Sequence, residues 1–291
     1  IQINQQLLKS GANIYEMNTI RKHLDLVKGG GLAKILYPAK VISLIFSDVP
    51  GNDISFIASG PTVKDKTTIK DALRIIKKYK LKIKKEDLIE TPKEDKYFRN
   101  VENILILSNL TALNRMKEIA ERFGLKVKIL TDNLRGDVKN VAKLLLKEVE
   151  KTKFDILLAG GETTVKVKGK GKGGRNQELV MWFLKYADLR RLNAELSKTN
   201  ADLRGLYADL RRTDRKNFLI ISINSDGWDN TPFAGAIGDE LTLEKANKLK
   251  LDIDKFLKNN DSYNFFKKVK EGIITGRLPI NVSDLILVWR I

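Results

Sequence analysis

One segment of this sequence combines residue types that suit the binding of an anion. It reads GKGKGGRNQE, with lysines and glycines alternating before Arg175 and Asn176. Glycine lets backbone N–H groups approach a ligand, and a helix beginning near Asn176 would direct its free amides and positive dipole end to the same place. Arg175 adds a planar fork for phosphate or carboxylate. The alternative is a flexible basic loop in which Asn176 is an ordinary helix cap. The expected binding residues are Lys170, Gly171, Gly173, Gly174 and Asn176, with Arg175 as a catalytic residue.

Four further polar segments each follow an apolar stretch that predicts a β-strand. They are SDVPGND (47–53), SNLTA (108–112), GGETT (160–164) and NSDGWDN (224–230). In α/β folds ligands bind beyond the carboxyl ends of strands, so together these segments predict a site. Asp48 and Asp226 can hold Mg²⁺ or accept a hydroxyl proton, and Asp226 is the expected metal ligand. Each segment could also be an ordinary turn, because Gly, Asp and Asn favour turns. The other expected binding residues are Ser47, Asn52, Gly160, Gly161, Glu162, Thr163, Thr164, Gly227 and Asp229.

Composition excludes several kinds of site. The chain has no cysteine and one histidine, His23. Disulfides and Cys/His zinc sites are therefore excluded, as is a Ser-His-Asp triad that does not use His23. A bound metal would be a hard cation on oxygen ligands, with Mg²⁺ the expected one. His23 is expected to be structural.

The net charge of +18 indicates an anionic partner. Lysines are spread over nearly every segment and only 7% of residues are aromatic, which favours small anionic substrates over nucleic acid. We find no apolar run of about 18 residues and no secretory signal, so we expect a cytoplasmic protein without a membrane partner. The abundance of Lys, Ile and Glu is typical of thermophiles.

Short apolar runs alternate with helical patterns, which predicts an α/β fold with mainly parallel pairing. The expected strands are 41–46, 102–107, 126–130, 155–159, 164–168, 218–223 and 282–289. The expected helices are 17–28, 67–79, 110–123, 136–150, 176–186, 243–249 and 261–270. The polar segment ETPKEDKYFRN (90–100) is the expected boundary between two domains, 1–98 and 99–291.

Residues 187–214 differ from their surroundings. They form four heptads, ADLRRLN, AELSKTN, ADLRGLY and ADLRRTD, with leucines at coiled-coil spacing. We interpret the block as an inserted, natural or engineered, helical element. It could fold back as a hairpin near 197–200, or it could exchange between protomers of a homo-oligomer, expected to be a dimer.

Two of these motifs resemble the glycerate 2-kinase family, whose C-terminal part is called the MOFRL domain. They are GGETTVKVKGKGKGGRNQE and SDGWDNTPFAGA, and further stretches agree, such as SLIFSDVPGNDISFIASGPTV and the closing NVSDL. The resemblance covers the chain except 187–214. It implies two Rossmann-like three-layer α/β domains with the active site in the cleft between them. It also implies ATP-dependent phosphorylation of D-glycerate at its 2-hydroxyl group, with Mg²⁺.

The chain also departs from the family pattern. A first third, with a lysine-bearing segment and a glycine-rich loop, has no counterpart here, and the sequence lacks an initiator Met. We therefore expect residues 1–98 to be the remnant of the N-terminal kinase domain and 99–291 to be the MOFRL-type domain. A closing glycine-threonine loop is replaced, although Asn281, an expected binding residue, and Asp284 are kept. The alternative function is a non-catalytic scaffold that oligomerises through 187–214.

Overall fold

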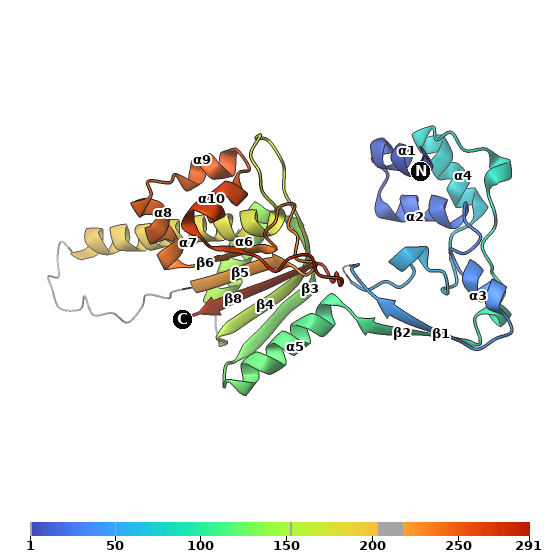
Figure 1. Ribbon diagram of the computed structural model, residues 1–291, viewed down its shortest axis with the longest axis horizontal. Helices are drawn as coiled ribbons and strands as arrows, with labels where there is room; N and C mark the ends of the chain where they lie inside the picture. The colour runs from blue at the N-terminus through green and yellow to red at the C-terminus, as the bar shows by residue number, and fades with distance from the viewer. Residues whose placement is uncertain (1, 50, 152, 203–217) are drawn as a thin grey trace. The chain divides into compact units, whose positions relative to one another are not determined.

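The chain folds into two compact units, Ile1–Ser108 and Asn109–Ile291 (Figure 1). The computed structural model describes residues 2–49, 51–151, 153–202 and 218–291, and each unit is treated by itself. The expected boundary lay after residue 98. Residues 99–108 fall in the first unit because strand β2 (Val101–Leu107) pairs in parallel with β1 (Val41–Phe46).

Helices form the core of the first unit. Helix α2 (Ile14–Lys22) and helix α4 (Ile69–Tyr79) pack with α1 (Gln2–Ser10), and α3 (Gly31–Leu36) follows α2. The sequence predicts a longer helix, 17–28, but α2 ends at Lys22. The segment beyond it turns instead: the Asp25 carboxylate accepts the N–H groups of Val27 and Lys28, and two glycines with positive φ follow.

The sheet of the first unit has two strands among the residues that the structure describes. Alternate side chains of β1 point to an open face, where Ile42, Leu44 and Phe46 are 55%, 59% and 56% exposed. The three-layer arrangement expected for both domains is therefore not complete in this unit.

The second unit is built on a six-stranded sheet in the order β3-β4-β8-β5-β6-β7. Strands β3 and β4 are parallel, whereas the pairs from β4 onward are antiparallel. Strand β8 lies between β4 and β5, which run in the same direction as β3, so the sheet is mixed. The strands are β3 (Val127–Asp137), β4 (Ile156–Thr164), β5 (Phe218–Asn224), β6 (Gly235–Gly238), β7 (Gly272–Ile273) and β8 (Asp284–Arg290).

Helices cover both faces of this sheet (Figure 1). Helix α5 (Asn109–Arg122) packs on one face through Leu113, which contacts Ile156 and Leu158 of β4. On the other face α6 (Val138–Glu150) and α7 (Arg175–Asp202) bury the larger core, together with three short helices. These are α8 (Glu240–Lys248), α9 (Ile253–Lys258) and α10 (Ser262–Val269). The α/β fold class is confirmed.

Some expected elements differ in extent. Strand β4 ends at Thr164, so the separate strand 164–168 is wrong. Helix α7 continues through residues 187–202, and the turn expected near 197–200 is helical. The rest of the heptad block, 203–214, lies outside the described residues. No helix among the described residues is long and apolar enough to span a membrane.

Candidate active site

The loop between β4 and α7 packs against the turn that precedes α10. The Asn260 side-chain oxygen accepts the N–H groups of Lys168 (2.8 Å) and Gly169 (3.0 Å). Asn259 accepts the N–H of Lys170 through its side chain and that of Gly171 through its carbonyl oxygen. The loop amides expected to bind an anion are therefore bonded within the chain, which corrects that prediction.

The glycines of this loop are explained by the same packing. A Cβ atom on Gly171 would lie 2.5 Å from the Asn259 carbonyl oxygen, and one on Gly173 would lie 2.2 Å from the Ser262 hydroxyl. A Cβ atom on Gly174 would lie 2.0 Å from the Asp229 carbonyl oxygen. What approaches this backbone is another part of the chain, and any larger residue would separate the two segments.

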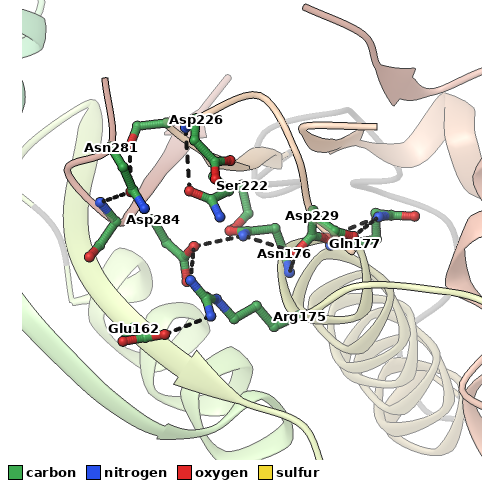
Figure 2. A network of polar contacts seen from close by, with 12 residues as sticks. Glu162, Arg175, Asn176, Gln177, Ser222, Asp226, Asp229, Asn281 and Asp284 are labelled. Atoms are coloured by element: carbon green, nitrogen blue, oxygen red, sulfur yellow. Dashed lines mark hydrogen bonds and ion pairs between the residues drawn. The ribbon is translucent and has the colours of Figure 1, made fainter. Parts of the chain in front are cut away.

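An internal carboxylate also occupies the start of α7. Asp229 accepts the backbone N–H groups of Asn176 (3.2 Å) and Gln177 (3.0 Å) and bonds to both side chains (Figure 2). The prediction that these helix amides bind a ligand anion is therefore not met in this structure. Asp229 is 3% exposed, and burial raises its pKa against the effect of these hydrogen bonds.

Arg175 lies between two carboxylates, as Figure 2 shows. Its Nε and Nη2 donate to the two oxygens of Asp284, over 2.8 and 3.1 Å, and Nη1 donates to Glu162 over 2.8 Å. The Asp284 side chain is 1% exposed, whereas those of Arg175 and Glu162 are 26% and 52% exposed. One edge of the guanidinium thus contacts a buried carboxylate, while the Arg175 side chain as a whole is partly exposed.

Asn176 connects this ion pair to the rest of the unit. Its side-chain N–H₂ group donates to Asp284 (2.8 Å) and Asp229 (3.3 Å), and its oxygen accepts the Ser222 hydroxyl (2.5 Å). Helix α7, strands β5 and β8, and the loop after β5 therefore meet at one fully buried side chain.

Burial affects the pKa values of both Asp284 and Arg175. It raises the pKa of Asp284 to about 6, although the charge and hydrogen bonds of Arg175 act in the opposite direction. Burial alone would lower the pKa of Arg175, but the charge and hydrogen bonds of Asp284, together with the charges of Glu162 and Asp229, outweigh it and the pKa is raised. Arg175 is therefore charged, and Asp284 changes charge near pH 6.

Asp226, expected as a catalytic residue and metal ligand, lies in the loop after β5 and is half-buried. Its carboxylate accepts the N–H of Trp228 (2.9 Å), and its carbonyl oxygen accepts the N–H of Leu278. Gly227 has φ +79°, and a Cβ atom there would lie 1.9 Å from the Gly276 carbonyl oxygen. Asn281 is exposed and accepts the N–H of Ser283.

The end of β4 supplies the other expected residues of this unit. Gly161 has φ +146° and packs on the backbone of Leu134, while Gly160 packs on the Asn109 side chain. Thr163 is buried and Thr164 is exposed, whereas Glu162 alone of this segment contacts Arg175.

The remaining expected residues belong to the first unit. The Ser47 N–H donates to the Leu107 carbonyl oxygen at the end of β1, and its hydroxyl accepts the N–H of Val49. Asp48 is exposed, and Asn52 has φ +55° in the turn that follows. Their roles stay predictions.

Asp284 and Gln177 are the main residues that sequence reasoning did not select for the site. Asp284 was noted only as part of NVSDL, and Gln177 only as part of the helix start. A charged residue within the expected apolar strand 282–289 was the available signal for Asp284.

A metal ion is compatible with part of this arrangement. The described residues contain no cluster of three or more His, Cys, Asp or Glu side chains suited to a metal. Mg²⁺ however needs only one or two carboxylates when substrate phosphates and water complete its shell. The Asp226 carboxylate, half-buried in a surface loop, fits that requirement.

Comparison with known proteins shows what the chain is similar to. The MOFRL family model matches residues 155–284, and the model described as Domain of unknown function (DUF4147) matches residues 1–91. D-glycerate 2-kinase from Thermotoga maritima is 36% identical over an alignment of 299 residues, which covers 98% of this chain and 65% of that protein. Glycerate kinase from Macaca fascicularis is 33% identical, over 99% of this chain and 81% of that protein.

A solved structure agrees with the sequence comparison. The crystal structure of glycerate kinase from Thermotoga maritima superposes with a TM-score of 0.82 at 36% sequence identity, covering 100% of this chain and 66% of that one. The chain thus spans a little under two thirds of the Thermotoga maritima relative.

Proposed function

Because this chain belongs to the glycerate 2-kinase family, we propose that it serves the ATP-dependent phosphorylation of D-glycerate at its 2-hydroxyl group, which gives 2-phosphoglycerate. The observation that carries the proposal is the state of Arg175. It is charged, fixed on one edge by Asp284 and partly exposed, beside the ends of β4 and β8. Phosphoryl transfer depends mainly on such fixed positive charge.

The residues of the second unit would have separate roles in binding the substrates and the metal. Arg175 would bind a phosphate group of ATP or the carboxylate of glycerate through its outer N–H groups. Asp226 would hold Mg²⁺, which when bound neutralises phosphate charge. The lysines of the loop before Arg175 would raise the local concentration of anionic substrates.

A coupled assay of ADP release tests this function. We expect turnover that requires both ATP and D-glycerate, measured on this chain and on a fusion with the N-terminal third of the Thermotoga maritima relative. Arg175→Ala should lower turnover by about 10²-fold or more, because a fixed charge at the reacting group is lost. Lys248→Ala is the matched control, since Lys248 is an exposed cation at the end of α8 with no role in the proposed site.

Two results would contradict the proposal. The first is the absence of ADP release from both folded proteins. The second is turnover by Arg175→Ala that equals turnover by Lys248→Ala.

The other function considered, a scaffold that oligomerises through 187–214, gains no support from the described residues. Most of its expected contact surface lies outside them. The homo-oligomer, the cytoplasmic location and the thermophile source also stay predictions. Light scattering on the purified chain would determine the oligomeric state.

A further inference from the structure

The Asp284 side chain is too buried to contact a ligand itself, but it makes a bidentate contact with Arg175. Its side chain is 1% exposed, and it accepts hydrogen bonds from two guanidinium nitrogens of Arg175. Such a bidentate pair fixes the plane of the guanidinium as well as its position. Asp284 can therefore influence a ligand only through Arg175, whose orientation it fixes.

The backbone of Asp284 is itself firmly placed. In the sheet it lies opposite Gly161 of β4 on one side and Asn224 of β5 on the other. Asn109, at the start of α5, donates to its carbonyl oxygen over 2.9 Å. The carboxylate is therefore attached to a central strand of the six-stranded sheet, while Arg175 is the first residue of helix α7.

The donors of Arg175 can be counted. A guanidinium has five N–H groups. Three of them donate to Asp284 and Glu162, which leaves one on Nη1 and one on Nη2. Because the Nε edge is held by Asp284, these two N–H groups point away from that edge, and the Arg175 side chain is partly exposed.

We propose that Asp284 is a positioning residue, which orients Arg175 so that its two remaining N–H groups bind an anionic group of the substrates. The inference rests on the proposed function, since it takes ATP and D-glycerate as the anions. Glu162 makes only one contact to Arg175 from an exposed position and cannot replace Asp284. Of the charged groups near Asp284, Arg175 is the cation, and Glu162 and Asp229 are the anions.

A double-mutant cycle tests the proposal. The dissociation constants of ATP and of D-glycerate are measured by calorimetry for the parent chain, Asp284→Asn, Arg175→Ala and the double variant. Asp284→Asn should weaken binding of at least one ligand by about tenfold. In the Arg175→Ala background the same change should alter affinity by less than about twofold, because there is no arginine left to orient.

A destabilised fold could imitate this result, so a matched control is needed. Asp65→Asn in the first unit removes the charge of another buried carboxylate, which pairs with Lys22 over 3.0 Å at 1% exposure. We expect a lowered melting temperature in Asp65→Asn without weaker ligand binding, and weaker ligand binding in Asp284→Asn. Equal weakening in the two variants, or the same factor in both backgrounds of the cycle, overturns the proposal.

A second readout needs no ligand. The ¹⁵N signal of the Arg175 Nε–H should be slow to exchange with water in the parent chain at pH 7 and fast in Asp284→Asn. If the parent chain binds neither ATP nor D-glycerate, the proposed function fails, and this exchange rate alone then decides whether Asp284 orders Arg175. Slow exchange in both proteins would show that Asp284 does not hold the guanidinium.

Discussion

The carboxylate of Asp229 lies on the backbone N–H groups of Asn176 and Gln177, over 3.2 and 3.0 Å, and so caps helix α7 from a loop 53 residues along the chain. Four donors from two residues converge on it. A helix start attracts negative charge through its free amides and dipole, and here the protein supplies that charge itself. The anion that the sequence predicts at this place is a side chain.

Asp229→Ala should lower the free energy of unfolding by about 2–4 kcal/mol, because it removes a cap and leaves buried donors without a partner. Urea unfolding measures the change. Asp226→Ala is the control in the same loop, where a half-buried carboxylate accepts one N–H, and it should lower stability by about 1 kcal/mol or less. Equal losses in the two variants would mean that Asp229 is not the cap.

Gly174→Ala should lower the melting temperature, because its Cβ atom would lie 2.0 Å from the carbonyl oxygen of Asp229 and 2.2 Å from its carboxyl carbon. Relief of that overlap requires the loop and α7 to separate, which we expect to lower stability by about 1–3 kcal/mol. Lys172→Ala keeps the backbone and serves as comparison, with a change within about 1 kcal/mol. Unchanged stability of Gly174→Ala would disprove the packing role of the glycine.

Local patterns predicted most of the elements but not their partners. Strands β1, β2 and β5 and helices α4 to α6 lie within a few residues of their expected bounds, because hydrophobic periodicity is a local property. The loop before Arg175 shows the limit. Its glycines and amides indicate that something approaches the backbone, and a phosphate or an asparagine side chain satisfies the same donors. Only the packed chain identifies Asn259 and Asn260 as the acceptors.

Whether Asp226 or Asp229 caps helix α7 was not predictable for the same reason. Both lie in NSDGWDN, and both are good turn residues. The N–H of Asp229 donates to the Phe233 carbonyl oxygen, which turns its side chain toward α7, while Asp226 stays at the surface side. Likewise strand β8, the last in the sequence, lies between β4 and β5, and no local sequence pattern predicts this strand order.

Lys22→Met should destabilise the first unit by about 3 kcal/mol, since it leaves the buried Asp65 carboxylate without its cation. The exposed pair Lys64–Asp95 is the matched comparison, and Lys64→Met should change stability by less than about 1 kcal/mol. Thermal unfolding of both variants at pH 7 decides the matter. A loss for Lys22→Met no larger than that for Lys64→Met would show that the buried pair is not needed.

Asp284 predicts a specific pH dependence of stability. Its pKa is about 6 in the folded chain against an ordinary value of 3.8, so between these values the folded state binds a proton that the unfolded state has lost. Stability from this group therefore falls as pH rises from about 4 to about 6 and is constant above. The two-unit difference corresponds to about 3 kcal/mol. Other carboxylates, such as Asp65, have lowered pKa values and act in the opposite direction, so the group must be isolated by difference.

The measurement is urea unfolding of the parent chain and Asp284→Asn at several pH values between 4 and 8. Asn cannot ionise, so the parent should lose stability relative to the variant as pH rises through this window. Ligand affinity should change in the other direction, because the ionised carboxylate is the form that holds Arg175. A stability difference that stays constant from pH 4 to 8 would contradict the raised pKa. Affinity that is equally high at pH 5 and pH 7 would contradict the link between Asp284 and Arg175.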